Sequence, residues 1–408
     1  MGLAAWPVFP IPEAAVSKGE EMAKIIYLDN AATTFPKPRE VLDFMVDRYA
    51  ALGVSPGRGS YDLALEADEL VSGARKRFCQ FFGGDDPDRV IFAYNATDAL
   101  NTLIQGLAEP GSHVVSSRLE HNSVLRPLYA LRERGMITYD LVPFDGSGFI
   151  NPRDVSRAIK PATRFVILTH ASNVLGTVQP VEEIGAVCSQ HGVPLLLDVT
   201  QSAGLLPINM GAWGVSAIAF TGHKSLLGPT GIGGLVLGRG LDVPTTRFGG
   251  TGIDSSSMVH TKDYPQHLEA GTINILGVIG LSAGLEYIRQ TGMDQLYAQE
   301  MSLTAHLRDG IRGLHGVRLY CADHKKSRIP LLLMNLEGME PEDLASILDG
   351  DFGIATRAGL HCAPLVHQDL GTAPKGAVRF SLGPLNTIDQ IDEAVEAIKK
   401  IAQFRRTG

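Results

Sequence analysis

The sequence has few charged residues, no basic excess and no long apolar run. Only 20% of its 408 residues are charged, and 44 acidic residues outnumber 36 basic ones, which gives a formal net charge of −8. Without a basic excess, the chain has no positive electrostatic field that would attract a nucleic-acid backbone or an anionic membrane surface. Apolar runs such as 194–197 and 331–334 fall far short of the roughly 20 residues that cross a bilayer. We expect a cytoplasmic protein with neither nucleic acid nor membrane as partner.

Cysteine is scarce, and none of the four cysteines has CxxC spacing: Cys79, Cys188, Cys321 and Cys362. This scarcity argues against a disulfide framework. His361 and His367 flank Cys362, but one cysteine and two histidines fall short of a structural zinc set. We therefore expect no metal. The other three cysteines are expected to be small buried hydrophobic residues.

Signals for strands and helices alternate along most of the chain. Helical patterns, for example at 97–107, 123–134 and 181–191, follow short strand-like runs. Those runs lie at 25–28, 90–92, 113–116, 138–143, 165–169, 195–198, 217–220 and 234–237. Strands separated by helices of about a dozen residues imply right-handed crossovers and a mostly parallel sheet. The sequence predicts one large α/β domain over residues 25–275.

The pattern changes after this domain. Residues 276–314 have continuous helical character and predict one long connecting helix. A smaller α+β domain is expected to complete residues 276–408, and the first residues of the large domain are free to pack on it. Residues 1–24 read as an N-terminal extension. Its first 16 residues contain three prolines and no lysine or arginine, which does not suit a secretory signal.

Polar residues follow three successive apolar strands where each strand ends. Ligands of an open parallel sheet bind beyond these carboxyl ends. The residues are His170, Ser172 and Asn173 after 165–169, Asp198 and Gln201 at the end of 195–198, and Thr221, His223 and Lys224 after 217–220. Each one alone has an ordinary explanation, such as a helix cap for the aspartate. Together they favour a shared site.

An amine, a carboxylate and an anion site at one sheet edge are what pyridoxal 5'-phosphate requires. Lys224 would form the Schiff base, and Asp198 would keep the pyridine nitrogen protonated. Thr97 opens a predicted helix, where free N–H groups and the helix dipole favour phosphate. Thr221 and His223 add donors beside the lysine.

Other features of the sequence bear on this cofactor hypothesis. His121 begins another predicted helix, so its ring would either stack on the pyridine or cap the helix. No GxxxxGK[ST] motif occurs, and the GIGG segment at 231–234 lacks dinucleotide spacing, so we interpret it as a tight turn.

Seven motifs carry a resemblance to a known family: IYLDNAATT (26–34), EHNS (120–123), HASNVLGT (170–177), DVTQSAG (198–204), TGHK (221–224), EAGT (269–272) and RAGLHCA (357–363). The chain resembles the class V aminotransferase superfamily of fold-type I pyridoxal phosphate enzymes. Within it, the RxGxHCA pattern is similar to the group II cysteine desulfurases and selenocysteine lyases. The resemblance implies a large domain with a mostly parallel sheet and a smaller C-terminal α+β domain.

The resemblance also implies roles for individual residues. Lys224 would be the Schiff-base lysine and Asp198 the partner of the pyridinium nitrogen. His121 would stack on the cofactor ring and also be a catalytic residue. The remaining cofactor-binding residues would be Thr97, Asn173, Gln201, Thr221, His223 and Thr272. Thr272 would reach the phosphate site of the neighbouring subunit, which implies a homodimer with shared sites.

For the reaction, the resemblance implies that Cys362 attacks the sulfur of L-cysteine, leaving L-alanine and an enzyme persulfide. Arg379 would bind the substrate carboxylate through its planar fork, with Asn173 and Arg357 beside the substrate. The sulfur would pass to an acceptor protein, for iron–sulfur clusters or other products. Leu360 stands where histidine is common in the group, which leaves the acceptor and the physiological substrate open. L-Selenocysteine as substrate, another class V reaction and a non-catalytic binding protein are the alternatives.

Overall fold

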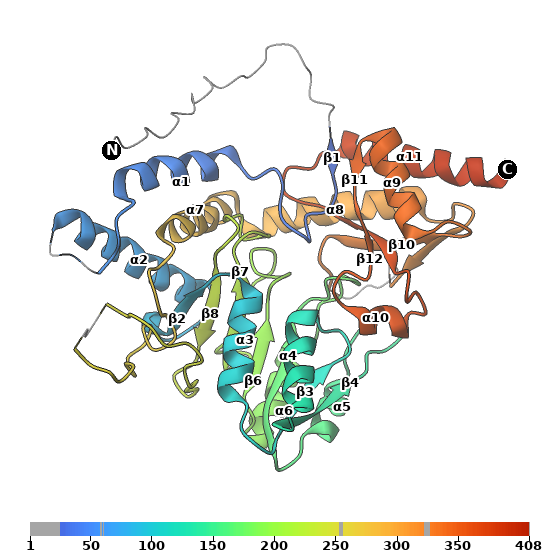
Figure 1. Ribbon diagram of the computed structural model, residues 1–408. Helices are drawn as coiled ribbons and strands as arrows, with labels where there is room; N and C mark the ends of the chain where they lie inside the picture. The colour runs from blue at the N-terminus through green and yellow to red at the C-terminus, as the bar shows by residue number, and fades with distance from the viewer. Residues whose placement is uncertain (1–24, 58, 60, 253–255, 322–326, 408) are drawn as a thin grey trace, which may run out of the picture.

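The computed structural model describes residues 25–57, 59, 61–252, 256–321 and 327–407. The extension expected at residues 1–24 lies outside the described residues. Figure 1 shows a large sheet flanked by helices and a smaller group of strands and helices that contains the C-terminus. Within the part of the chain that the structure describes, no helix is both long and apolar enough to cross a membrane.

A seven-stranded sheet forms the larger half of the molecule. Its strands are β2 (Val90–Ala93), β3 (Ser112–Ser117), β4 (Ile137–Val142), β5 (Thr163–Thr169), β6 (Leu195–Asp198), β7 (Ala217–Thr221) and β8 (Gly233–Leu237). Their order is β2-β8-β7-β6-β5-β3-β4, and only β8 runs antiparallel to its neighbours. Strand β8 reverses because no crossover helix separates it from β7. The predicted mostly parallel sheet is confirmed.

Helices cover both faces of this sheet, and successive strand residues point to opposite faces. Val114 packs with α3 (Ala96–Leu107) and α4 (Asn122–Glu133), whereas Val115 packs on the other face. The same alternation occurs in β6, where Leu196 and Leu197 belong to different clusters. The remaining helices of this half are α1 (Arg39–Leu52), α2 (Asp62–Phe81), α5 (Pro152–Ala158), α6 (Val181–His191) and α7 (Ile275–Thr291), with a short 3-10 turn at Pro87–Arg89.

A four-stranded antiparallel sheet lies in the C-terminal part. Its order is β12-β13-β10-β9, formed by β9 (Val317–Tyr320), β10 (Leu331–Leu336), β12 (Arg357–Gly359) and β13 (Ala377–Ser381). The helices of this part are α8 (Met293–Ile311), α9 (Pro341–Phe352), α10 (Pro364–Asp369) and α11 (Ile388–Thr407). The first strand, β1 (Ile26–Tyr27), pairs in parallel with β11 (Ile354–Ala355). The N-terminal strand therefore packs on the C-terminal part.

The single long helix predicted at 276–314 is wrong. The chain forms α7 and α8 there, and the two are separated at Gly292. The backbone of Gly292 has φ 92° and ψ 118°, a conformation that no α-helix contains and that glycine adopts at little cost. The break lets α7 pack against the large sheet while α8 packs in the C-terminal core.

Helix α7 also packs directly on the loop that follows Lys224. A Cβ atom at Gly284 would lie 2.1 Å from the carbonyl oxygen of Leu226 and 3.1 Å from the amide nitrogen of Gly228. These are backbone atoms that cannot rotate away. The absence of a side chain at Gly284 therefore sets how closely the helix approaches this loop.

We expect Gly284→Ala to lower the free energy of unfolding by about 1–3 kcal/mol, because overpacking forces the backbone to shift. Gly350→Ala is the matched control, since this glycine lies in α9 and a Cβ atom there would meet open space. The control should be neutral or gain up to about 1 kcal/mol from its better helix propensity. Urea unfolding followed by circular dichroism measures both, and equal midpoints for the two variants would contradict the packing argument.

Candidate active site

A cavity of about 310 Å³ lies at the carboxyl ends of β5, β6 and β7. The structure brings ten of the sequence-predicted residues to its wall: Thr97, His121, Asn173, Asp198, Gln201, Thr221, His223, Lys224, Arg357 and Arg379. Two predicted residues, Thr272 and Cys362, line other cavities. The cavity draws on both sheets, because Arg357 and Arg379 belong to the smaller one.

Lys224 and Asp198 form an oppositely charged pair of groups in this cavity. Burial lowers the pKa of Lys224 to about 8, helped by the nearby charge of Arg379 and opposed by Asp198. Burial raises the pKa of Asp198, which is 4% exposed, while the hydrogen bond from the backbone amide of Thr200 and the charge of Lys224 lower it. The amide of Thr200 donates to Asp198 Oδ1 at 2.9 Å. The amine is therefore more easily deprotonated than an ordinary lysine.

The N-terminus of α3 supplies one end of the cavity. Asn95 precedes the helix, and its side chain accepts a hydrogen bond from the amide of Asp98 at 3.0 Å. The amides of Ala96 and Thr97 lie in the first turn, where no intrahelical acceptor exists, and both residues line the cavity. Free amides and the helix dipole make this end suited to an anion.

Three polar side-chain atoms of residues that line this cavity lack partners among the described residues. Thr200 Oγ1, Thr221 Oγ1 and His223 Nδ1 are buried without a hydrogen bond. Buried polar groups are rarely left unsatisfied, so these atoms indicate a missing polar ligand. Burial lowers the pKa of His223 to about 4, and the charges of Lys224 and Lys37 lower it further. Thr200 was not predicted, although it stands inside the DVTQ motif between two residues that were.

His121 caps helix α4, which is one of the two roles that its position in the sequence predicted. Its Nδ1 accepts from the amide of Ser123 at 3.0 Å and so caps α4. Burial lowers the pKa of His121 to about 4, as do the charges of Lys224 and Arg357. The neutral ring therefore carries its proton on Nε2. The ring also lines the cavity, so capping holds it there in one orientation.

Glu120 is a buried acid that the sequence argument missed. It is 0% exposed, and its Oε1 accepts from Ser117 Oγ at 2.5 Å and from the amide of Thr169 at 3.1 Å. Burial raises the pKa of Glu120 to about 8, so at neutral pH the carboxyl holds a proton. Glu120 thereby ties the end of β3 to the end of β5 just before His121. Its only sequence signal was its place in the EHNS motif.

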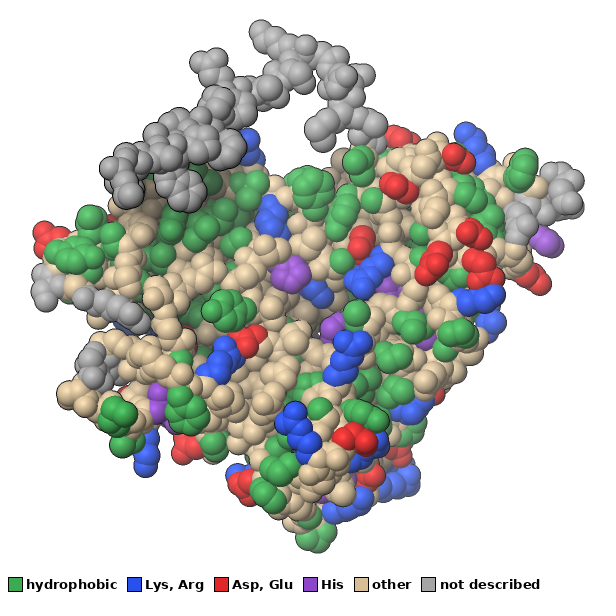
Figure 2. All heavy atoms as spheres, viewed as in Figure 1, with side chains coloured by type: hydrophobic (Ala, Val, Ile, Leu, Met, Phe, Trp, Pro, Cys, Tyr) green, Lys and Arg blue, Asp and Glu red, His purple; other side chains and the backbone are tan. Residues whose placement is uncertain are grey.

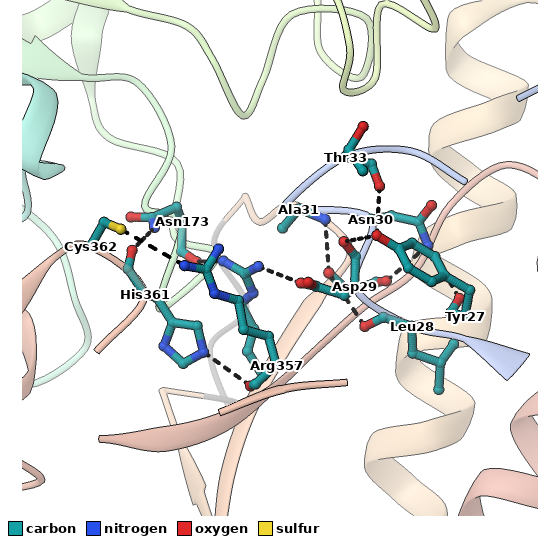
Figure 3. Close-up of polar contacts among 12 residues, drawn as sticks. Tyr27, Leu28, Asp29, Asn30, Ala31, Thr33, Asn173, Arg357, His361 and Cys362 are labelled. Atoms are coloured by element: carbon teal, nitrogen blue, oxygen red, sulfur yellow. Dashed lines mark hydrogen bonds and ion pairs between the residues drawn. The ribbon is translucent and has the colours of Figure 1, made fainter. Parts of the chain in front are cut away.

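The two cavity arginines have different partners. Arg379 is 1% exposed, and its Nη2 pairs with Asp29 Oδ1 at 2.6 Å while its Nη1 donates to the carbonyl of Asn173 at 2.9 Å. Its Nε is buried without a partner among the described residues. Arg357 has no carboxylate partner in the part of the chain that the structure describes; its Nη2 lies 3.8 Å from Cys362 Sγ. Figure 3 shows Asp29, Arg357 and Cys362 in this arrangement.

The side-chain amides of Asn173 and Gln201, both predicted to bind the cofactor, donate to backbone carbonyls of the protein. Asn173 Nδ2 donates to the carbonyl of His361 at 2.7 Å, and Gln201 Nε2 donates to the carbonyl of Ala31 at 3.1 Å. Figure 3 shows Asn173 pointing toward the segment that carries Cys362. Both residues line the cavity, and both also fix loops that close it.

Cys362 sits in a strained and tightly held loop. His361 and Cys362 have φ values of 50° and 58°, in the left-handed region that residues with a side chain rarely adopt. Their carbonyls are both bonded, that of His361 by Asn173 and that of Cys362 by the amide of Asn122 at 2.7 Å. These contacts from other loops offset the strain and fix the position of the thiol.

A chain of hydrogen bonds orients the two histidines beside this cysteine. His361 Nε2 lies 3.1 Å from the carbonyl of Arg357, which can only accept, so His361 carries its proton on Nε2. His361 Nδ1 must then accept from His367 Nε2 at 3.3 Å, and His367 Nδ1 accepts from Thr372 Oγ1 at 2.8 Å. Burial lowers the pKa of His361 to about 2 and that of His367 to about 4. Both rings are therefore neutral supports of the loop.

The other cysteines lie away from this cavity. Cys79 and Cys188 are buried, as predicted, whereas Cys321 is only half-buried. Among the described residues, no group of three or more His, Cys, Asp or Glu side chains could hold a metal ion.

Thr272 is separated from the other predicted cofactor residues. It lines a different cavity, together with Arg75 and Glu269. Arg75 Nη2 pairs with Glu269 Oε2 at 2.7 Å, and the amide of Phe92 donates to Glu269 Oε1 at 2.5 Å. These buried contacts hold the EAGT segment against β2, with Thr272 exposed at its end.

Comparison with known proteins gives consistent matches over nearly the whole chain. A family model described as Aminotransferase class-V matches residues 26–394. A probable cysteine desulfurase of Methanothermobacter thermautotrophicus is 35% identical over 383 residues, covering 92% of this chain and 94% of that protein. One from Halobacterium salinarum is 32% identical, covering 97% of this chain and 95% of that protein.

Solved structures give the same result. The apo structure of a cysteine desulfurase from Thermococcus onnurineus NA1 matches with a TM-score of 0.87 at 30% identity, covering 93% of this chain and 95% of that one. The cysteine desulfurase CsdA of Escherichia coli, in an S-sulfonic acid form, matches with a TM-score of 0.83 at 27% identity and the same coverage.

The lowered pKa of Lys224 predicts how stability depends on pH in the protein without ligand. The unfolded chain keeps this proton up to about pH 10.5 and the folded chain only up to about pH 8, so this lysine makes stability rise with pH between the two values. Lys224→Met should therefore be more stable than the parent below pH 8, with the advantage shrinking toward pH 10.5. Urea unfolding at several pH values tests this, with Lys399→Met on α11 as control for general loss of a lysine.

Proposed function

The chain belongs to the class-V aminotransferase family and, within it, to the cysteine desulfurases, and from this premise we propose that it converts L-cysteine to L-alanine with pyridoxal 5'-phosphate. The sulfur remains as a persulfide on Cys362. The observation that carries this proposal is the joint placement of Lys224, Asp198 and a set of unpartnered donors in one cavity, with Cys362 beside it.

The residues of the cavity fit the cofactor. The unsatisfied side chains of Thr200, Thr221 and His223 line the same cavity as the N-terminus of α3, and together with it they would hold the phosphate. Asp198 would face the ring nitrogen, and the amine of Lys224 would hold the aldehyde carbon covalently. When bound, pyridoxal phosphate supplies an electron sink for bond changes at the substrate carbons.

The chain's own groups handle the proton and the carboxylate. Because the pKa of Lys224 is about 8, its amine is partly neutral near neutral pH and can take a proton from the substrate carbon at Nζ. The substrate carboxylate would lie between Arg357, which has no carboxylate partner among the described residues, and the free Nε of Arg379.

Cys362 then takes the sulfur. Its thiolate attacks the sulfur of the substrate, so that the carbon–sulfur bond breaks and a sulfur–sulfur bond forms. The carbon retains the bonding electrons and receives a proton, which gives alanine. Arg357 Nη2, 3.8 Å from Sγ, is placed to stabilise negative charge on the attacking sulfur. No external oxidant is required in this half of the reaction.

We further propose that the persulfide supplies sulfur for iron–sulfur clusters or other sulfur-containing products in the cytoplasm, through an acceptor. The held loop supports an acceptor that comes to the cysteine, because the carbonyls of His361 and Cys362 are both bonded to other loops. Turnover without an acceptor should accordingly be slow.

A homodimer would complete the site. Thr272 is exposed on a segment outside the cavity of Lys224, as expected of a residue that serves a neighbouring subunit. Apolar side chains are exposed nearby on α1 and α2, including Phe44 at 53%, Val46 at 60% and Leu65 at 54%. Figure 2 shows hydrophobic side chains gathered over these helices. Exposed apolar patches of this kind mark protein interfaces.

Cys362→Ala should still bind pyridoxal phosphate and turn yellow, because none of the residues assigned to the cofactor is a thiol. Alanine formation from L-cysteine should fall by about 10²-fold or more, since no nucleophile remains for the sulfur. L-Selenocysteine should be spared in part. Cys321→Ala is the matched control and should behave as the parent. Parental alanine production by Cys362→Ala would refute the desulfurase assignment and favour another reaction of this family.

The dimer prediction is tested by sedimentation. The parent should have twice the 43.7 kDa mass of the chain, and Phe44→Asp combined with Val46→Asp should shift it toward monomer with a loss of bound cofactor. Full activity of a 43.7 kDa monomer at micromolar concentration would contradict the shared site.

A further inference from the structure

A groove of about 450 Å³ lies between α3 and α4 and shares lining residues with the cavity of Lys224. Both cavities are lined by Thr97, His121 and Ser123, but Cys362 lines only the groove. The thiol that receives sulfur is therefore open to a second space.

The groove is a continuous surface built by helical spacing. Thr97, Asn101 and Gln105 recur every four residues along one face of α3. Across the groove, Arg126 and Arg134 lie eight residues apart on α4 and its C-terminal cap, so they also share one face. The groove thus runs along both helices from the cysteine loop.

The charge of the groove is opposite to that of the chain. Arg126 and Arg134 line it, and none of its other lining residues is acidic, although the chain as a whole has a net charge of −8. Neither guanidinium has an ion pair or hydrogen bond with another described residue. Arg132, the other arginine of α4, is paired with Glu133 at 3.0 Å. Two unpaired cations along a groove that reaches a thiol favour an anionic ligand.

We propose that this groove binds the sulfur acceptor as a small thiol that carries carboxylate groups, held by Arg126 near the cysteine loop and attracted into the groove by the added charge of Arg134. The inference rests on the proposed function, because it assumes a persulfide on Cys362. A cavity of this volume suits a small molecule. The loop carrying Cys362 is held in place, so the acceptor has to enter the groove to reach the sulfur.

The transfer step balances without an oxidant. The acceptor thiolate attacks the outer sulfur of the Cys362 persulfide and forms a new sulfur–sulfur bond. The bond between that sulfur and Cys362 Sγ breaks, and its electron pair leaves as the Cys362 thiolate. The products are the acceptor persulfide and the free enzyme thiol, ready for another substrate molecule.

The test separates sulfur uptake from sulfur release. Holoenzyme is loaded with L-cysteine in the absence of thiol, and the alanine burst and the persulfide on Cys362 are measured by mass spectrometry after alkylation. The loaded enzyme is then mixed with mercaptosuccinate, which carries two carboxylates, or with 2-mercaptoethanol, which carries none. The decay of the persulfide gives a second-order rate constant for each thiol.

Arg126→Gln combined with Arg134→Gln should leave the burst unchanged and lower the rate constant for mercaptosuccinate by about tenfold at low salt. The rate constant for 2-mercaptoethanol should not change. Arg132→Gln, on the same helix but outside the groove, should match the parent with both thiols. The parental preference for mercaptosuccinate should also shrink as ionic strength rises, because salt screens exposed charges.

A normal burst with equal effects of the double variant on both thiols would overturn the groove proposal while leaving the desulfurase assignment intact. The same holds if only a protein acceptor, and neither thiol, clears the persulfide. Absence of a burst in the parent enzyme would instead refute the proposed function on which the inference rests.

Discussion

The buried guanidinium of Arg379 is the contact on which the geometry of the site depends. It belongs to β13 of the smaller sheet, yet it pairs with Asp29 near the N-terminus and bonds the carbonyl of Asn173 after β5. A buried charge without a partner costs several kcal/mol, so these contacts stabilise only one arrangement of the three segments. The same charge reaches into the cavity and lowers the pKa of Lys224.

Asn173 transmits this arrangement to the cysteine loop. Its backbone carbonyl accepts from Arg379, and its side chain donates to the carbonyl of His361. The thiol of Cys362 is therefore positioned relative to the cavity by contacts with the large sheet, even though the loop belongs to the C-terminal part. This position places the thiol on the wall of the groove between α3 and α4, 3.8 Å from Arg357, which lines the cavity of Lys224.

Burial also settles the protonation of the groups around the site. The pKa values of four histidines fall well below neutrality because desolvation disfavours the charged ring: His121, His223, His361 and His367. Their donors and acceptors are consequently constant near neutral pH. Lys224, by contrast, has a pKa of about 8, which is close to that range. The site thus combines fixed hydrogen-bonding supports with one group whose proton is available for chemistry.

The sequence by itself determined the alternation of strands and helices, the mostly parallel sheet and the polar residues at the strand ends. These features depend on local periodicity and on short motifs of neighbouring residues. It did not determine the break at Gly292, whose effect follows from two cores that pack α7 and α8 separately. Nor could it show that Asp29 pairs with Arg379, or that Asn173 holds His361. Those contacts join segments 188 and 350 residues apart, and only tertiary packing decides which buried polar groups meet.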